Sequence, residues 1–352
     1  TRDISGITPC CARKFVYALS PASTNFLAQF GVIPEMSRVA PVRAMQVWGD
    51  SPSDDASRLQ FGRGGHLASI VEHAVLMHAL RGRLATDGMV NMRAGAAPAG
   101  LSMDGSRHLV TLQDGGSLAG DLIIAADGRQ SRIRELAGIP VVVNDYKSDG
   151  IVGNLRCEKP HGDIARQWFT ANGVLALLPL PGGQVSMVWS VSRELSSTAP
   201  AEERLALAAR IGDECGHALG EMSFVSRIDR FPLARITASR WVEPGLALIG
   251  DAAHAVHPLA GQGVNLGFGD VAALCGAIGG RSRFSGVGDV SLLRQYERGR
   301  REAAWAVGQV TEGLRSLFSS EARAAKWFRN GGLEWVERVP PAKSLLIDYA
   351  TG

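Results

Sequence analysis

The stretch of residues 246–270 constrains the fold of this chain more than any other part of the sequence. It begins with four apolar residues, 246–249, of the kind that form a buried strand. Gly250 ends this run, and Asp251 follows at the C-terminal end of the strand, where open α/β sheets place their ligands. This order predicts a strand of an α/β sheet that carries a carboxylate at its ligand-binding edge.

A glycine-rich turn and a predicted helix follow this strand. Pro258 lies in a His257–Pro258 turn, and Gly261-Gln262-Gly263 leads into Val264 and Asn265. Glycines directly before a helix let a ligand approach the bare backbone, and the helix N-terminus favours negative charge there. A carboxylate, a glycine-lined turn and a positive helix end together suit a polyhydroxylated cofactor whose ring becomes anionic.

A second strand–turn–helix pattern lies at residues 121–134. An apolar run, residues 122–126, predicts a buried strand, Asp127-Gly128 predicts a tight turn, and a helix begins before Arg134. Taken alone, this pattern is also that of an ordinary strand, turn and helix with nothing bound.

Composition limits the class of protein. A chain of 352 residues with 45% hydrophobic and 20% charged residues is typical of a globular protein of about two domains. Because 37 basic residues face 34 acidic ones and no long basic run occurs, nucleic-acid binding is not expected. The five cysteines are scattered without a Cys-x-x-Cys pair, which favours reduced thiols in a cytoplasmic protein. No signal-peptide pattern and no membrane-spanning apolar run is found.

Local patterns predict the other elements. The expected helices are residues 21–30, 69–84 and 201–219, the expected strands are 41–48, 150–157 and 222–228, and the expected hairpins are 173–180 with 184–191 and those at Asp104-Gly105 and Asp114-Gly115. His73 and His78 are five residues apart and do not share a helix face, so no metal site is predicted from them.

The two motifs together resemble those of the flavin-dependent aromatic hydroxylases. Gly-Asp-Ala-Ala-His-x-x-x-Pro-x-x-Gly-Gln-Gly-x-Asn is similar to the second FAD motif of that family, and Ala-Asp-Gly-x-x-Ser-x-x-Arg resembles its middle motif. The resemblance implies that Asp251 binds the ribityl chain of FAD and that Arg134 is a structural or pyrophosphate-side cation. The other cofactor-binding residues that it implies are Pro258, Gly261, Gly263, Val264 and Asn265 at the flavin, with Asp127 and Gly128 nearby.

Further segments resemble the ubiquinone-biosynthesis hydroxylases in particular. They are Tyr17-Ala-Leu-Ser-Pro-Ala-Ser, residues 41–48, Ile70-Val-Glu-His, Ala176-Leu-Leu-Pro-Leu and Pro340-Pro-Ala-Lys-Ser-Leu-Leu. The implied α/β fold has a Rossmann-like FAD/NAD(P)-binding domain that is N-terminally incomplete, an inserted β-rich substrate domain and a C-terminal helical segment. The implied bounds are 1–40, 64–145 and 235–290 for the FAD-binding domain, 41–63 and 146–234 for the substrate domain, and 291–352 for the helical region.

The function that the resemblance implies is FAD-dependent hydroxylation of a prenylated phenol in ubiquinone biosynthesis, with NAD(P)H and O2 and through a flavin hydroperoxide. No protein nucleophile is predicted, because the cofactor carries the oxidative chemistry. Expected partners are a lipid-soluble phenol, a quinone-biosynthesis complex and, peripherally, a membrane surface. Residues 331–349 are one candidate for membrane contact, with core packing as the default explanation. His254 and His257 also have a metal-like spacing, but Pro258 and the glycines fit a flavin turn better, so no metal is predicted.

The N-terminal end departs from the family pattern. The family opens with a βαβ unit whose Gly-x-Gly-x-x-Gly binds the ADP half of FAD, and residues 1–15 contain no such motif. We therefore expect a fragment, or a form without the first strand and phosphate loop, and weaker FAD binding in either case. Two alternatives stay open: a flavoprotein with other chemistry, such as halogenation or reduction, and a truncated non-catalytic remnant or assembly subunit with weak or no FAD binding.

Overall fold

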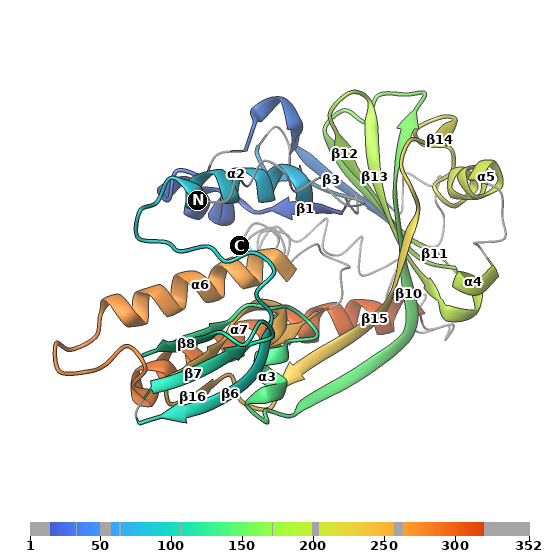
Figure 1. Ribbon diagram of the computed structural model, residues 1–352. Helices are drawn as coiled ribbons and strands as arrows, with labels where there is room; N and C mark the ends of the chain where they lie inside the picture. Colours follow the sequence, from blue (N-terminus) through green and yellow to red (C-terminus); the bar gives the residue numbers. More distant parts are fainter. Residues whose placement is uncertain are drawn as a thin grey trace.

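The computed structural model describes residues 15–32, 34–49, 58–62, 65–105, 107–170, 172–198, 204–256 and 263–319. They form a mixed α/β fold in which four sheets are joined by helices (Figure 1). Three of the sheets are small and three-stranded, and one is large and nine-stranded. The candidate site lies at the small sheet whose strand of residues 246–248 leads into the turn at Asp251.

The first small sheet has the order β1-β5-β2. It contains β1 (Val16–Leu19), β5 (Ala68–Glu72) and β2 (Val39–Val42). Helix α1 (Pro21–Gln29) follows β1 along the chain, and helix α2 (His73–Ala85) follows β5. The predicted start of α1 is confirmed: the Ser20 hydroxyl accepts a hydrogen bond from the Ser23 N–H at 3.2 Å, and Pro21 occupies the first helical position. Gly31, with φ +69°, follows its end.

Two predicted elements are wrong in their bounds. Residues 69–72 belong to strand β5 rather than to the following helix, because Ile70 and Val71 pair with β1 on one side and β2 on the other and are both buried. The predicted strand 41–48 is divided at Arg43 into β2 and β3 (Ala44–Trp48), which belong to different sheets. Tertiary pairing thus overrides the local pattern in both places.

The large sheet has the order β18-β15-β10-β13-β12-β11-β3-β4, with β14 paired to β10. Its strands are β18 (His254–Ala255), β15 (Asp229–Ala238), β10 (Val141–Cys157), β13 (Gln184–Ser192), β12 (Gly173–Leu180), β11 (Ile164–Thr170), β3 (Ala44–Trp48), β4 (Arg58–Phe61) and β14 (Met222–Phe224). The predicted hairpin of β12 and β13 is confirmed. The predicted strand 150–157 is only the second half of β10, which extends back to Val141 by pairing with β15. Helices α4 (Arg193–Thr198) and α5 (Arg204–Glu214) follow β13 along the chain. Within the sheet, the buried indoles of Trp48 and Trp168 stack with their ring centroids 4.8 Å apart.

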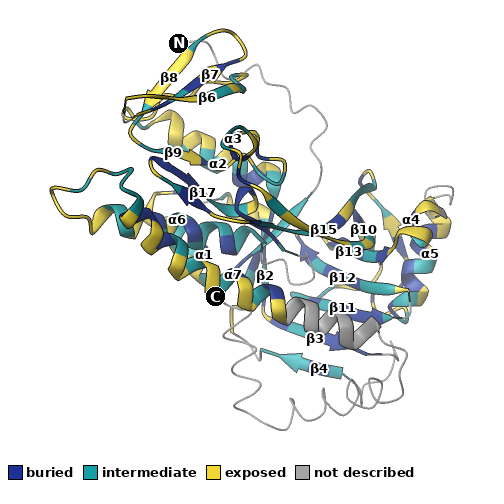
Figure 2. Cartoon of the chain, turned by 90° about the horizontal axis from the view of Figure 1, so that it is seen from below, coloured by how far each residue is buried: buried dark blue, intermediate teal, exposed yellow. Residues whose placement is uncertain are grey.

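The sheet below the candidate site has the order β16-β17-β9. Strand β17 (Leu246–Leu248) runs parallel to β9 (Ile123–Ala125), and β16 (Val242–Glu243) is antiparallel to β17. Both predicted strands, 122–126 and 246–249, are thus present, and their parallel pairing brings their carboxyl ends to one edge. Figure 2 shows β17 as buried.

Helices and a third small sheet surround this edge. Helices α6 (Gly263–Gly279) and α7 (Val290–Ser319) and the short helix α3 (Arg132–Leu136) contribute side chains to the same apolar core as β9 and β17. The hairpins predicted at the two Asp-Gly pairs are confirmed as the sheet β6-β7-β8, formed by Pro98–Asp104, Arg107–Leu112 and Ser117–Gly120.

Candidate cofactor site

The Gly250–Asp251 turn is the centre of the candidate site. It forms a short 3-10 helix, η4 (Gly250–Ala252), directly after β17. Gly250 has φ +57°, a left-handed conformation that side chains disfavour. A Cβ atom added to Gly250 would lie 3.9 Å from the Cα of Gly267, so the turn packs backbone against backbone on α6. The positive φ of Gly250 therefore sets the direction of the turn, which packs closely on the helix.

Asp251 presents its carboxylate beside this turn. The residue is exposed, and no hydrogen bond to its side chain comes from the part of the chain that the structure describes. The surrounding protein is still close enough that burial raises the pKa of Asp251, against the lowering effects of Arg129 and of His254. An accessible carboxylate at a strand end can accept hydrogen bonds from the hydroxyl groups of a ligand.

Asn265 holds the start of α6 against the first small sheet. Its Oδ1 accepts a hydrogen bond from the Ser20 N–H at 3.0 Å, and its Nδ2 donates to the Ala18 carbonyl at 2.9 Å. Val264 packs on the apolar cluster formed by α1, α2 and β5. Gly263 has open space where a side chain would lie. The flavin contacts predicted for these residues stay predictions, as do those of Pro258 and Gly261, which lie outside the described residues.

The Asp127-Gly128 turn lies at the C-terminal end of β9. The Asp127 Oδ2 atom accepts hydrogen bonds from the N–H groups of Arg132 at 2.7 Å and Ile133 at 3.1 Å, so it caps α3. Gly128 has φ +83° and open space at its Cβ position. Their predicted place beside the cofactor stays a prediction, and the observed contacts give Asp127 a structural role at the helix end.

Arg134 connects the two motif turns. Its side chain is buried, and its Nη1 donates to the Ala252 carbonyl at 2.8 Å while its Nη2 donates to the Arg129 carbonyl at 3.0 Å. Of the two roles that the resemblance implied for this cation, these contacts support the structural one. Arg129 in turn donates to the carbonyls of Pro232 and Ala234 on β15, at 3.3 Å each, which links the turn to the large sheet.

A buried charged network below the turn was not identified from the sequence. Asp270 on α6 is 0% exposed, and its Oδ2 accepts hydrogen bonds from the Gly250 N–H at 2.9 Å and from His254 Nε2 at 2.6 Å. Its Oδ1 accepts from Arg300 Nε at 2.8 Å. Burial opposes ionisation of Asp270, but the hydrogen bond and charge of His254 and the hydrogen bonds of Arg300 and the Gly250 N–H outweigh it and lower its pKa. The signal in the sequence was a single charged residue within the otherwise uncharged helix α6.

A tyrosine–histidine pair lies next to this site. The Tyr17 hydroxyl is 2.8 Å from His73 Nδ1, and burial, followed by the negative charge of Asp251, raises the pKa of Tyr17. Burial, with the charge of Arg81, lowers the pKa of His73. Both shifts favour the uncharged forms of the two side chains near neutral pH.

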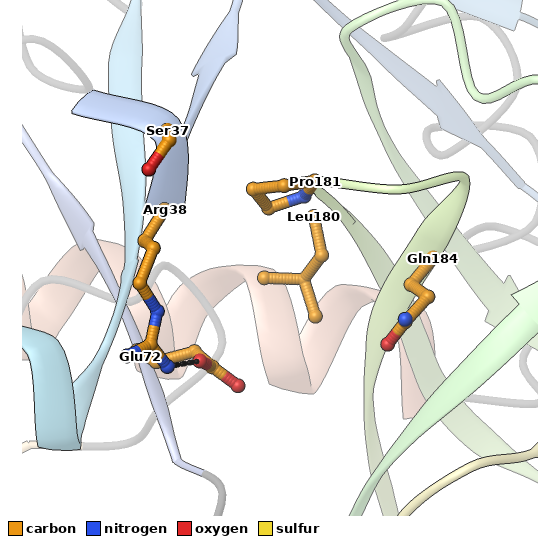
Figure 3. Close-up of a pocket in the computed structure, with 6 residues that line it drawn as sticks. All are labelled: Ser37, Arg38, Glu72, Leu180, Pro181 and Gln184. Carbon is orange, nitrogen blue, oxygen red and sulfur yellow. Dashed lines mark hydrogen bonds and ion pairs between the residues drawn. The ribbon is translucent and has the colours of Figure 1, made fainter. Parts of the chain in front are cut away.

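A small cavity of about 230 Å³ is lined on one side by Glu72, the residue before His73 (Figure 3). The ion pair of Arg38 and Glu72, at 3.0 Å, forms one wall, and Glu72 directly precedes His73. Across the cavity lie residues from the end of β12 and the turn into β13, and the full lining is Ser37, Arg38, Glu72, Leu180, Pro181 and Gln184. The cavity therefore lies where the first small sheet meets the large sheet.

The described residues fit the flavin half of FAD. The carboxylate of Asp251 is accessible, Gly128 and Gly263 leave open space at their Cβ positions, and α6 packs against η4, with a helix N-terminus of the kind that favours negative charge. Among the described residues there is no group of three or more metal-ligating side chains. His257 lies outside them, and the Nε2 atom of His254 bonds Asp270.

Comparison with known proteins identifies the family of this chain. The family described as "FAD binding domain" matches residues 21–311. The 3-demethoxyubiquinol 3-hydroxylase of Escherichia coli (strain K12) is 32% identical over 347 residues, which cover 96% of this chain and 87% of that protein. The ubiquinone hydroxylase UbiL of Rhodospirillum rubrum is 34% identical over 293 residues, covering 82% of this chain and 67% of that protein.

Solved structures show the same fold. The p-nitrophenol 4-monooxygenase PnpA of Pseudomonas putida aligns with a TM-score of 0.78 at 15% identity, over 99% of this chain and 90% of that one. Klebsiella pneumoniae HpxO, complexed with FAD and uric acid, aligns with a TM-score of 0.74 at 19% identity, over 97% of this chain and 89% of that one. Fold and site thus define a flavin-dependent monooxygenase with FAD as its cofactor.

The chain belongs to the FAD-dependent aromatic hydroxylase family and to its ubiquinone-biosynthesis subgroup. No helix in the described part of the chain is long and apolar enough to cross a membrane.

Proposed function

We propose that this chain hydroxylates a prenylated phenol on the route to ubiquinone. One atom of O2 enters a ring C–H bond to form C–OH, the other leaves as water, and NAD(P)H is oxidised to NAD(P)+ with uptake of one proton. The similarity to the Escherichia coli 3-demethoxyubiquinol 3-hydroxylase over 96% of the chain supports this choice of substrate class.

The observation that carries the proposal is the accessible Asp251 carboxylate in the turn η4 after β17, a turn that packs on α6 and whose Ala252 carbonyl accepts a hydrogen bond from Arg134. In the proposed complex, Asp251 accepts hydrogen bonds from ribityl hydroxyl groups, and Gly263 and Asn265 at the start of α6 lie beside the flavin ring. When bound, FAD supplies the two-electron and O2 chemistry that protein side chains lack. The positive end of α6 stabilises negative charge on the ring.

The cavity of Figure 3 is the proposed site of the phenol. Arg38 and Gln184 supply hydrogen-bond donors for ring oxygens, and Leu180 and Pro181 supply apolar contacts for the ring face. The end of β12 and the start of β13 form the large-sheet side of this region. The Tyr17 hydroxyl and His73 Nδ1 are hydrogen-bonded to each other, and burial favours the uncharged form of both side chains, so the pair can orient a polar group of the substrate without a change of charge.

We further propose that the substrate is collected at a membrane surface, with which the protein makes peripheral contact, and that it works within a quinone-biosynthesis complex. The low water solubility of a prenylated phenol supports this location. Residues 331–349, which lie outside the described residues, are the candidate segment. Flotation with anionic vesicles, compared between the whole chain and a chain ending at residue 330, tests the contact; equal flotation of the two would reject this segment.

The decisive experiment is FAD binding followed by turnover. The purified chain, mixed with FAD, is expected to quench FAD fluorescence and to show a flavin absorption band. Asp251→Ala should weaken this binding by about 100-fold or more, because charge-assisted hydrogen bonds contribute about 1.5–3 kcal/mol each. Asp213→Ala is the matched control, since Asp213 is an exposed carboxylate on α5.

With FAD bound, a prenylated phenol should stimulate NAD(P)H oxidation and gain one oxygen atom by mass spectrometry. NAD(P)H oxidation without oxygen insertion would favour a flavoprotein of other chemistry. No FAD binding by the wild-type chain would favour the non-catalytic alternative. Equal FAD affinity of Asp251→Ala and wild type would reject the role given to Asp251.

A further inference from the structure

The carboxylate of Asp270 occupies an unusual place for a purely structural charge. It is 0% exposed, and a buried ion pair seldom adds to stability, because removing two charges from water offsets their attraction. A well-packed apolar pair would fill the same volume between α6 and α7 at no such cost. Retention of a buried charge here therefore needs a reason beyond stability.

The hydrogen bonds of Asp270 supply that reason. One carboxylate oxygen accepts the Gly250 N–H, which belongs to the residue directly before Asp251. The same oxygen also accepts from His254, which follows Asp251 by three positions and stacks on Trp241 with ring centroids 4.7 Å apart. Asp270 thus holds the chain both before and after the cofactor-facing carboxylate.

Two guanidinium groups, one buried and one half-buried, complete this support. Arg300 donates to the second oxygen of Asp270 and to the Leu266 carbonyl, which keeps the carboxylate ionised and fixed on α6. From the opposite side, Arg134 donates to the Ala252 carbonyl. The Gly250 N–H, before Asp251, is therefore bound to a negative charge, and the Ala252 carbonyl, after it, is bound to a positive charge. The turn cannot rotate without breaking one of these charge-assisted hydrogen bonds.

We propose that Asp270 is a positioning residue for FAD binding: its buried carboxylate holds the Gly250–Ala252 turn so that Asp251 faces the ribityl hydroxyl groups. Asp270 itself does not contact the cofactor. The inference rests on the proposed role of Asp251 and adds to it the group that fixes its orientation.

Four proteins test this proposal: wild type, Tyr296→Phe, Asp270→Asn, and the double variant Asp270→Asn/Arg300→Gln. Asn has the shape of Asp without its charge and offers one acceptor oxygen where three donors converge. The double variant also removes the guanidinium that Asp270→Asn would leave without its carboxylate partner, and is expected to keep the fold if Asp270→Asn alone does not. Tyr296→Phe is the stability control, because it removes a buried hydrogen bond to the Leu248 carbonyl in the same core without touching the turn.

The measurements are FAD affinity by fluorescence quenching, melting temperature without FAD, and hydrogen exchange of the peptide covering residues 246–256. We expect Asp270→Asn and the double variant to bind FAD about 10- to 100-fold more weakly, as when a supporting residue of a binding site is removed. Faster exchange in this peptide should accompany the loss. Tyr296→Phe should lower the melting temperature and leave FAD affinity within about threefold of wild type.

A double variant that binds FAD as tightly as Tyr296→Phe overturns the proposal, as does a loss of affinity in all variants that simply follows their melting temperatures. These outcomes differ from failure of the proposed Asp251 role. If Asp251→Ala keeps its FAD affinity, the cofactor assignment itself falls, whereas if only the Asp270 variants keep it, Asp251 remains the ligand and another group positions it.

Discussion

The large sheet and the candidate cofactor edge, formed by the carboxyl ends of β9 and β17 with the turns at residues 127–128 and 250–252, are stabilised in different ways. The large sheet is held by apolar packing, with the buried indoles of Trp48, Trp168 and Trp189 among its interior side chains. The cofactor edge consists of short strands and turns held by a few buried polar side chains, chiefly Asp270 and Arg134. The stability of the large sheet comes from many apolar contacts, whereas each hydrogen bond at the cofactor edge orients one backbone group of a turn. Substitutions in the first region should change stability, and those in the second should change binding.

The largest expected change in stability comes from the large sheet. Trp168→Ala removes a fully buried indole that stacks on Trp48, and should lower the free energy of unfolding by about 3–5 kcal/mol. Urea unfolding of the variant and wild type measures this difference. The folded fraction should keep its FAD affinity; a specific loss of FAD affinity would break the contrast between the two regions.

A smaller loss of stability, combined with a loss of binding, is expected at the start of α6. Asn265→Ala leaves the Ser20 N–H and the Ala18 carbonyl without their partner, at a cost of about 1–3 kcal/mol. FAD affinity should fall as well, because the helix end is released from the first small sheet. Denaturation and FAD titration of the same preparation check both effects, and an unchanged affinity would limit Asn265 to a structural clamp.

The pH dependence of stability should reflect Asp270. Its folded-state pKa is lowered, despite burial, by His254, Arg300 and the Gly250 N–H, so its ionised form stabilises the fold at pH values above its unfolded pKa. This contribution is lost as the pH falls through the lower folded-state pKa. Acid titration of melting temperature should show a fall below about pH 4 that is smaller in Asp270→Asn/Arg300→Gln. Identical profiles would assign the acid transition to other carboxylates.

A modest effect is expected at the second motif turn. Asp127→Ala removes the acceptor for two N–H groups of α3, and loss of such a cap costs about 1 kcal/mol. The Ser131 hydroxyl still accepts from the Arg134 N–H, so the helix should persist. A melting curve measures the loss. A change of several kilocalories would indicate that Asp127 supports more than the helix end.

The smallest effect should come from an exposed ion pair outside both regions. Arg107 and Asp121 are 2.6 Å apart, but both side chains are more than half exposed. Because solvent screens such pairs, Arg107→Ala should leave melting temperature and FAD affinity unchanged. The same two measurements check it, and a clear loss in either would show that the hairpin sheet supports the cofactor edge.

Local sequence signals predicted much of this fold. The cap at Ser20-Pro21, the two strand–turn units that end at Asp127 and Asp251, and the hairpins at their glycine turns are present as expected. Each depends on interactions within a few residues, where residue type restricts backbone angles or supplies a cap. The predicted start of α2 and the predicted continuous strand 41–48 were wrong, because pairing with distant strands determines where β5, β2 and β3 begin and end.

The sequence by itself determined the family and placed Asp251 and the glycines of the candidate site at the end of a strand. Only the tertiary structure decided what holds that carboxylate in place. Asp270 meets Gly250 across 20 residues and Arg300 across 30, and Asn265 meets Ser20 across 245. Such contacts depend on the packing of helices and sheets against one another, and residue type alone does not specify which distant partner a polar side chain meets.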